Sequence, residues 1–233
     1  MKFIDIKKFE YTDFSVILFN GNSKWKENTY IIKKNENSEG YIIDPGFGCQ
    51  HVVDYVTDNR LFIRSILLTH AHHDHLATAS YISEKLDVPC IFHKDDYKLF
   101  MHAPMYSMRF AGEMVKRPKN TKFYDGDCED ELNLWGINLL HVPGHSHGGV
   151  CLFFKNIVIT GDTIIKEKLG RTDLPEGDRG ELKKSVDCFF KVASEMKNLD
   201  IYPGHGENWT GRDFLEWWSV NNDSFQEHTT FEA

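Results

Sequence analysis

The sequence lacks several features that would place the protein in a specialised class. No stretch approaches the roughly 18 consecutive apolar residues that a membrane span needs. Residues 1–8 carry charges throughout and contain no signal-peptide core, so we expect a cytoplasmic protein. The five cysteines form no CxxC pair, and their odd number argues against a full disulfide framework. We expect Cys90, Cys151 and Cys188 to lie in the core.

The charge of the chain counts against nucleic acid as its usual partner. The formal net charge is −8 at pH 7, and the basic residues form no long stripe. The best local run, Lys116–Lys119, is either a solvated loop or a basic rim that attracts an anionic substrate. We therefore expect a small-molecule substrate, with neither nucleic acid nor membrane as a partner. The oligomeric state stays open at this point.

Length and apolar patterning predict one α/β domain over residues 1–233. Apolar runs predict strands at 14–19, 29–33, 41–44, 64–68, 89–92, 150–154 and 156–160. Helices are expected at 50–59, 76–86, 180–196 and 212–220. We interpret 132–135 and 137–142 as a hairpin that turns at Gly136. Two strand-rich halves, each with helices, favour two sheets packed face to face with helices outside.

Residues 94–122 depart from this rhythm, because they concentrate aromatic side chains and four of the six methionines. One interpretation is a helix packed in the core. The other is a helical flap insertion, at about 94–122, that covers the functional cleft and lines an apolar substrate pocket. Methionine suits such adaptable binding surfaces.

Metal-ligand side chains crowd into residues 70–75, which read His-Ala-His-His-Asp-His. The run follows an apolar strand and precedes an expected helix, so a rigid scaffold can aim several side chains at one point. Neutral imidazole is a good donor to zinc, iron or manganese. His70 and His72, two apart on an extended loop, point to one side, whereas Asp74 and His75 can serve a second metal nearby.

Three later segments each add one ligand at a similar turn. His145 lies on a Gly/Pro-rich loop after an apolar run, and both Asp162 and His205 come just past expected strands. Each turn alone is weak support for a metal site. Four strand-end ligand groups in one chain are a strong signal, because independent turns rarely all end in ligand residues.

The sequence resembles the metallo-β-lactamase fold superfamily, whose mark is Thr-His-x-His-x-Asp-His followed by separate His, Asp and His ligands. Here the motif covers Thr69–His75, and the resemblance extends from about 14 to about 218. It implies a four-layer αβ/βα sandwich with two mixed β-sheets and helices outside. It further implies one metal on His70, His72 and His145, a second on Asp74, His75 and His205, and Asp162 as the bridge. His73 fills the variable position, so we expect it beside the ligands or facing solvent.

The implied cofactors are two divalent metal ions, zinc first, with iron or manganese as alternatives. Two such ions can share a hydroxide, orient it and stabilise the oxyanion that it creates. Asp74 would orient this hydroxide as well as bind metal, so Asp74 and Asp162 are the expected catalytic carboxylates. The predicted reaction is hydrolysis of an acyl bond.

A further segment favours a thioester as the substrate. Gly170–Asp178 resembles a Gly-Arg-x-Asp-aromatic/Leu-Pro-x-Gly segment that is typical of glyoxalase II-like hydrolases and of persulfide dioxygenases. We expect Arg171 and Asp173 to fix this loop against the metal site. Few residues follow His205, so the helical domain with which full-length glyoxalase II grips glutathione is not expected. The chain is therefore similar to a single-domain glyoxalase II-like hydrolase, with glutathione specificity in doubt.

Three alternatives stay open. A mononuclear iron persulfide dioxygenase shares the ligand set, although the sequence Pro203–Glu207 looks more like the hydrolases. A lactonase of the same fold is a second alternative. A metal-binding module without turnover is the third, and retention of every ligand position argues against it.

Overall fold

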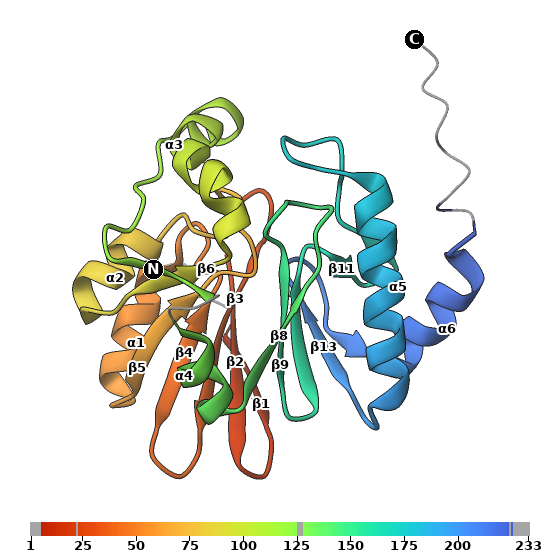
Figure 1. Cartoon of the computed structure of the whole chain (residues 1–233). Helices are drawn as coiled ribbons and strands as arrows, with labels where there is room; N and C mark the ends of the chain where they lie inside the picture. Colours follow the sequence, from red (N-terminus) through yellow and green to blue (C-terminus); the bar gives the residue numbers. More distant parts are fainter. Residues whose placement is uncertain (1–5, 22, 125–127, 224, 226–233) are drawn as a thin grey trace.

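The computed structural model describes residues 6–21, 23–124, 128–223 and 225 of the chain. Two β-sheets lie face to face in the middle of the molecule, and helices cover the outer face of each (Figure 1). The predicted four-layer αβ/βα sandwich is therefore confirmed. Within the described ranges, no helix is long and apolar enough to cross a membrane.

The first sheet contains seven strands in chain order among the described residues: β1 (Ile6–Glu10), β2 (Phe14–Asn20), β3 (Asn28–Lys34), β4 (Glu39–Ile43), β5 (Phe62–Leu67), β6 (Cys90–Phe92) and β7 (Thr121–Phe123). The pairs from β1 to β4 are antiparallel, whereas those from β4 to β7 are parallel, so the sheet is mixed. Its outer face carries α1 (Val52–Asp58) and α2 (Ala79–Leu86), and α3 (Tyr97–Ala111) lies above its edge (Figure 1).

The second sheet is also mixed, and its strand order in the described part is β14 (Trp209–Thr210), β13 (Asp200–Pro203), β10 (Ile157–Gly161), β9 (Val150–Phe154) and β8 (Ile137–His141). Only β10 and β13 pair in parallel within it. The helices α5 (Arg179–Glu195) and α6 (Gly211–Asn221) cover its outer face (Figure 1). A small hairpin of β11 (Ile164–Ile165) and β12 (Lys168–Leu169) follows β10.

Side chains that alternate between the two faces of the inner strands fill the space on both sides of the first sheet. In β2, Val16 and Leu18 face the second sheet, whereas Ile17 and Phe19 face the helices. All four side chains are buried, because successive residues of a strand point to opposite faces and both faces are covered. A third apolar cluster lies between the second sheet and α5 and α6.

Two predictions are wrong. Residues 132–135 are not a strand, because they belong to α4 (Glu129–Trp135), which ends at Gly136 in a left-handed conformation with φ of 97°. Leu132 and Trp135, three apart, share the buried helical face. Cys188 is exposed rather than in the core, since Val186 and Phe189 occupy the buried face of α5.

Candidate metal centre

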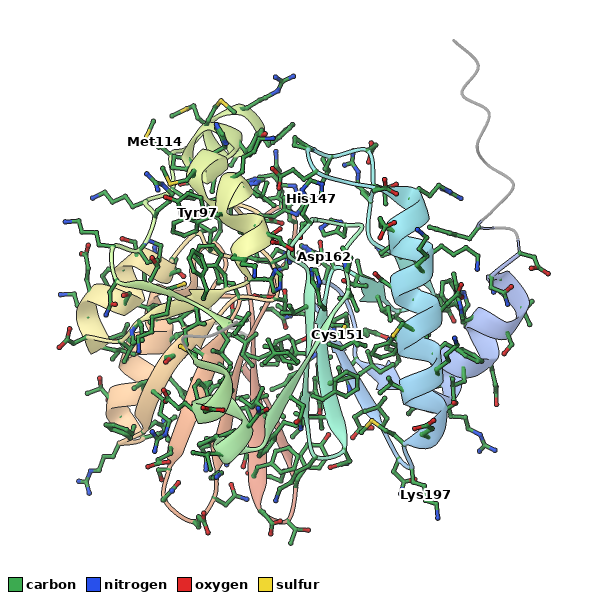
Figure 2. The ribbon with its side chains drawn as sticks, viewed as in Figure 1. Tyr97, Met114, His147, Cys151, Asp162 and Lys197 are labelled. Carbon is green, nitrogen blue, oxygen red and sulfur yellow. The ribbon has the colours of Figure 1, made fainter. Side chains whose placement is uncertain are left out.

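The predicted ligands gather at one edge of the two sheets. The loop after β5 carries the residues from His70 to His75, and the other ligands follow β8, β10 and β13. Ligand groups collect at this edge because the carboxyl ends of neighbouring strands meet there. Figure 2 shows Asp162 at this edge, while Lys197 lies at the opposite end of the molecule.

His70, His72 and His145 form the first group of candidate ligands. Each offers a ring nitrogen, and these nitrogens all lie within 4.8 Å of one another. Nδ1 of His72 lies 2.9 Å from Nε2 of His145. Among the described residues, Nε2 of His70 and Nε2 of His72 are buried and have no hydrogen-bond partner. Buried nitrogens without partners are costly unless something binds them.

Asp74, His75 and His205 form the second group, with ligand atoms again within 4.8 Å of one another. Nε2 of His75 lies 3.2 Å from Nε2 of His205, and Nε2 of His205 lies 3.6 Å from Oδ2 of Asp74. Several lone pairs therefore converge on one point, which is the arrangement that a cation requires.

Asp162 lies between the two groups. Its Oδ2 atom is 3.6 Å from Nε2 of His145 and 3.3 Å from Nε2 of His205, and its Oδ1 atom is 3.4 Å from Nε2 of His75. Oδ1 is buried and finds no hydrogen-bond partner in the described part of the chain. One carboxylate thus faces both groups, and the nitrogen and oxygen donors fit two divalent cations.

The charges of the site favour cations too. Burial by itself would raise the pKa of Asp162, but His205 and His75 hold that pKa well below its usual value. Burial opposes a proton on His205, yet the Asp162 carboxylate raises the pKa of His205 to about 10. These shifts arise because positive charge beside the buried carboxylates is electrostatically favourable, and bound metal ions would supply that charge.

Comparison with known proteins identifies the family. The model of the metallo-β-lactamase superfamily matches residues 24–205. The chain belongs to this superfamily. An uncharacterized protein of Mycobacterium tuberculosis is 32% identical over 199 residues, which cover 78% of this chain and 87% of the relative. A probable metallo-hydrolase of Methanocaldococcus jannaschii is 30% identical over 187 residues, covering 78% of this chain and 89% of the relative.

A solved structure agrees. The crystal structure of TTHA1623 in a di-iron-bound form superposes with a TM-score of 0.72 at 29% identity, and the match covers 84% of this chain and 94% of that one. The predicted family is thus confirmed, and divalent metal binding is supported by this neighbour together with the ligand groups described above. The family and its metallo-hydrolase relative likewise support a metal-dependent hydrolase.

A buried aspartate that sequence reasoning missed orients one ligand of this superfamily site. Asp44 accepts hydrogen bonds from the backbone N–H of Thr69 at 2.7 Å and from its hydroxyl at 2.5 Å. Its Oδ2 atom also lies 3.2 Å from Nδ1 of His75. Asp44 adopts a φ of 48°, a left-handed conformation that aspartate tolerates. The sequence signal is the Asp-Pro-Gly turn at 44–46, where the strand expected at 41–44 ends.

A second missed aspartate joins two ligand loops. The buried Asp96 accepts hydrogen bonds from the N–H of Ala71 at 2.8 Å, from the hydroxyl of Ser146 at 3.0 Å and from the N–H of Gly148 at 2.5 Å. Ala71 lies between two candidate ligands, and Ser146 follows a third. Asp96 therefore fixes the distance between these loops. No local pattern marks it, because its partners are far away in the sequence.

The loop Gly170–Asp178 touches the site through its backbone. The carbonyl of Arg171 accepts a hydrogen bond from Nδ1 of His145 at 2.7 Å, which orients that ring. The Arg171 side chain forms two hydrogen bonds to Asp173, at 2.9 and 2.8 Å, and this pair is exposed. The contacts agree with a loop that is held against His145.

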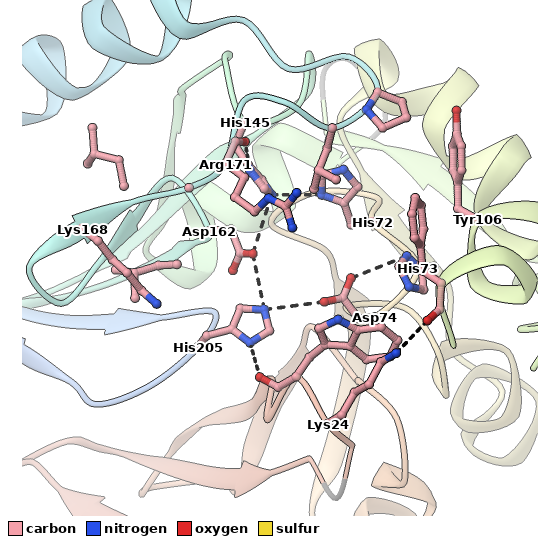
Figure 3. A pocket seen from close by; sticks show the side chains of 17 residues that line it. Lys24, His72, His73, Asp74, Tyr106, His145, Asp162, Lys168, Arg171 and His205 are labelled. Atoms are coloured by element: carbon pink, nitrogen blue, oxygen red, sulfur yellow. Dashed lines mark hydrogen bonds and ion pairs between the residues drawn. The ribbon is translucent and has the colours of Figure 1, made fainter. Parts of the chain in front are cut away.

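A pocket of 480 Å³ opens onto the ligands (Figure 3). Its lining includes His72, Asp74, His145, Asp162 and His205 together with apolar, aromatic and basic side chains. His73 also lines it and is only 9% exposed, so of its two expected positions it takes the one beside the ligands, with Nδ1 3.8 Å from Oδ1 of Asp74. Pockets of this size and mixed character suit small-molecule substrates.

Proposed function

We propose that the chain is a metal-dependent hydrolase of acyl thioesters, similar to single-domain glyoxalase II-like enzymes. The observation that carries the proposal is the double ligand group beside a pocket of mixed apolar and polar lining, with Asp162 facing both groups. In this proposal His70, His72 and His145 hold one divalent ion, and Asp74, His75 and His205 hold the other. Asp162, whose carboxylate faces both groups, would help to hold both ions.

The pocket residues would divide the work of the reaction. Bound metal ions would activate water and polarise the scissile carbonyl. Oδ2 of Asp74 lies 3.8 Å from Nε2 of His75 and 3.6 Å from Nε2 of His205, and its Oδ1 lies 3.8 Å from Nδ1 of His73. In this proposal the Asp74 carboxylate would orient the attacking water as well as hold metal. Hydrolysis forms a C–O bond and breaks the acyl C–S bond. The sulfur leaves with a proton, and the acyl group leaves as a carboxylic acid.

The segment Gly170–Asp178 supports a thioester as the substrate class. It resembles the corresponding segment of glyoxalase II-like hydrolases, and here its Arg171 carbonyl orients His145. Leu174 and Pro175 of the same segment line the pocket beside the ligands. The segment therefore belongs to the substrate-binding surface as well as to the support of the metal site.

The first test is thiol release from S-lactoylglutathione. The protein is stripped with a chelator and reloaded separately with zinc, manganese or iron(II), because the donor set accepts all three. Asp162→Ala, loaded in the same way, serves as the inactive control. Metal-dependent release is the expected result, with zinc as the expected native metal. An absence of release with every metal would refute the thioester proposal, and oxygen uptake by the iron form with a persulfide would then indicate a dioxygenase.

A further inference from the structure

One end of the pocket is built from aromatic side chains. Trp25, His73, Tyr106 and Phe110 all line it. The rings of Trp25 and His73 meet edge to face at 5.4 Å, and the ring of His73 stacks with that of Phe110 at 6.0 Å. The rings of Tyr106 and Phe110 stack at 6.3 Å. These four residues, which we call the aromatic wall, form a continuous surface beside the candidate metal ligands.

The wall joins three separate segments, and polar contacts tie them together. Trp25 comes from the loop between β2 and β3, His73 from the ligand motif, and Phe110 from α3. Nζ of Lys24 donates to the carbonyl of Phe110 at 2.8 Å and lies 4.5 Å from the centre of the Trp25 ring. The carbonyl of Trp25 accepts a hydrogen bond from Nδ1 of His205 at 2.9 Å. A candidate metal ligand therefore holds the backbone of Trp25 in the wall.

The wall is not simply part of the core. Phe110 is 39% exposed although it lines the pocket. His73 is almost buried, and within the described residues its Nε2 atom has no hydrogen-bond partner. An apolar surface that is open on the pocket side, with an unpartnered polar atom within it, has the character of a ligand-binding surface.

The other end of the pocket has a different chemistry. Lys168 and Arg171 line it together with Leu174 and Pro175. Figure 3 shows Lys168 on one side of the ligand cluster and His73 and Tyr106 on the other. A substrate that spans the ligands would therefore place a polar or anionic part near Lys168 and an apolar part against the aromatic wall.

We propose that the aromatic wall is the acyl subsite and that it selects acyl groups that carry a flat aromatic ring, such as the phenylacetyl group. The proposal rests on the thioester hydrolase function above, since it assigns the two ends of the pocket to the two halves of a thioester. Aromatic rings prefer stacked or edge-to-face partners, and an aromatic acyl group would find such partners among the rings that line this end of the pocket. The thiol half then extends toward Lys168, where an anionic carrier meets opposite charge, whereas the Arg171 side chain is paired with Asp173.

The test compares three substrates with the zinc-loaded protein: phenylacetyl-glutathione, S-lactoylglutathione, and a lactoyl thioester of benzyl thiol. The phenylacetyl substrate should have the highest kcat/KM, by about tenfold. Phe110→Ala and Trp25→Ala should each lower the ratio of kcat/KM for this substrate to kcat/KM for S-lactoylglutathione about tenfold. Phe110→Leu, which keeps apolar bulk without the ring, should lose most of the preference. Met105→Ala is the matched control, because Met105 is exposed on the same helix and does not line the pocket.

A binding measurement separates this proposal from the proposed function. Calorimetry with metal-free protein should detect phenylacetamide, a neutral probe, and should detect no acetamide, and Phe110→Ala should abolish the difference. If no thioester is hydrolysed but this binding pattern holds, the thioester function fails and the aromatic subsite stands. Equal kcat/KM for the two glutathione substrates, preference for the ring on the thiol side, or equal binding of both amides would each overturn the acyl subsite.

Discussion

Oδ2 of Asp44 lies 3.2 Å from Nδ1 of His75, and both side chains are buried. The same carboxylate accepts two hydrogen bonds from Thr69, which starts the ligand motif. Asp44 thus orients the His75 ring so that Nε2 faces His205, and it fixes the turn from which the motif begins. Carboxylates that orient metal-binding imidazoles contribute to metal affinity without touching the metal.

Replacing Asp44 with asparagine should therefore weaken metal binding. Asparagine tolerates the left-handed φ of 48° but loses the charge opposite His75. We expect a loss of about 10- to 100-fold in zinc affinity, measured by competition with a chromogenic chelator. Asp58→Asn, on the exposed end of α1, is the matched control. Equal affinities for the two variants would show that Asp44 supports only the fold.

Asp162→Ala should lose metal and activity together. The substitution removes the carboxylate that faces both ligand groups, so metal affinity should fall at both sites. The loss should be at least the roughly 10- to 100-fold that is typical when a residue hydrogen-bonded to a metal ligand is removed. Metal content is measured by elemental analysis after dialysis, and activity by thiol release. Asp13→Ala, which removes an exposed carboxylate paired with Lys155, should retain both. Full metal content in Asp162→Ala would mean that the ligand assignment is wrong.

Asp96 should make stability depend on pH. Burial raises the pKa of Asp96 from 3.8 to about 6, although hydrogen bonds from Ala71, Gly148 and Ser146 oppose the rise. The pKa of Asp96 is higher in the folded state than in the unfolded state, so protonation of Asp96 stabilises the folded protein. This stabilisation is fully present below about pH 4 and is lost as pH rises through about 6. The free energy of unfolding of the natural protein minus that of Asp96→Asn should thus be about 2–3 kcal/mol larger at pH 4 than at pH 7. Urea titrations with chelator present measure it, and a difference that grows with pH would contradict it.

The cysteines should differ sharply in reactivity. Cys188 is exposed, whereas Cys49, Cys90, Cys128 and Cys151 are buried. Burial raises the pKa of the Cys49 thiol to about 11, and only the thiolate reacts readily. A disulfide reagent at pH 8 should therefore titrate one thiol in the folded protein and five in denaturant. Cys188→Ser should leave none reactive in the folded state, and rapid labelling of that variant would show that a buried thiol becomes accessible.

Local patterns served well where local physics decides the structure. The apolar run Phe14–Phe19 predicts a strand, and β2 is that strand, buried on both faces. The same reasoning failed at 132–135, because four residues with apolar side chains at both ends fit a strand and a helical turn equally well. The left-handed Gly136 and packing between the layers decided for the helix.

By itself, the sequence determined the family, the layered fold and the set of candidate ligands. The layered fold follows from the apolar runs, and the family and the ligands follow from the residue types at the ends of those runs. Only the tertiary structure revealed Asp44 and Asp96 as supports of the ligand loops, and only it joined Trp25, His73 and Phe110 into one wall. The physical reason is that these contacts link segments far apart in the chain. Strand register and loop packing set their distances, and neither can be read from one sequence.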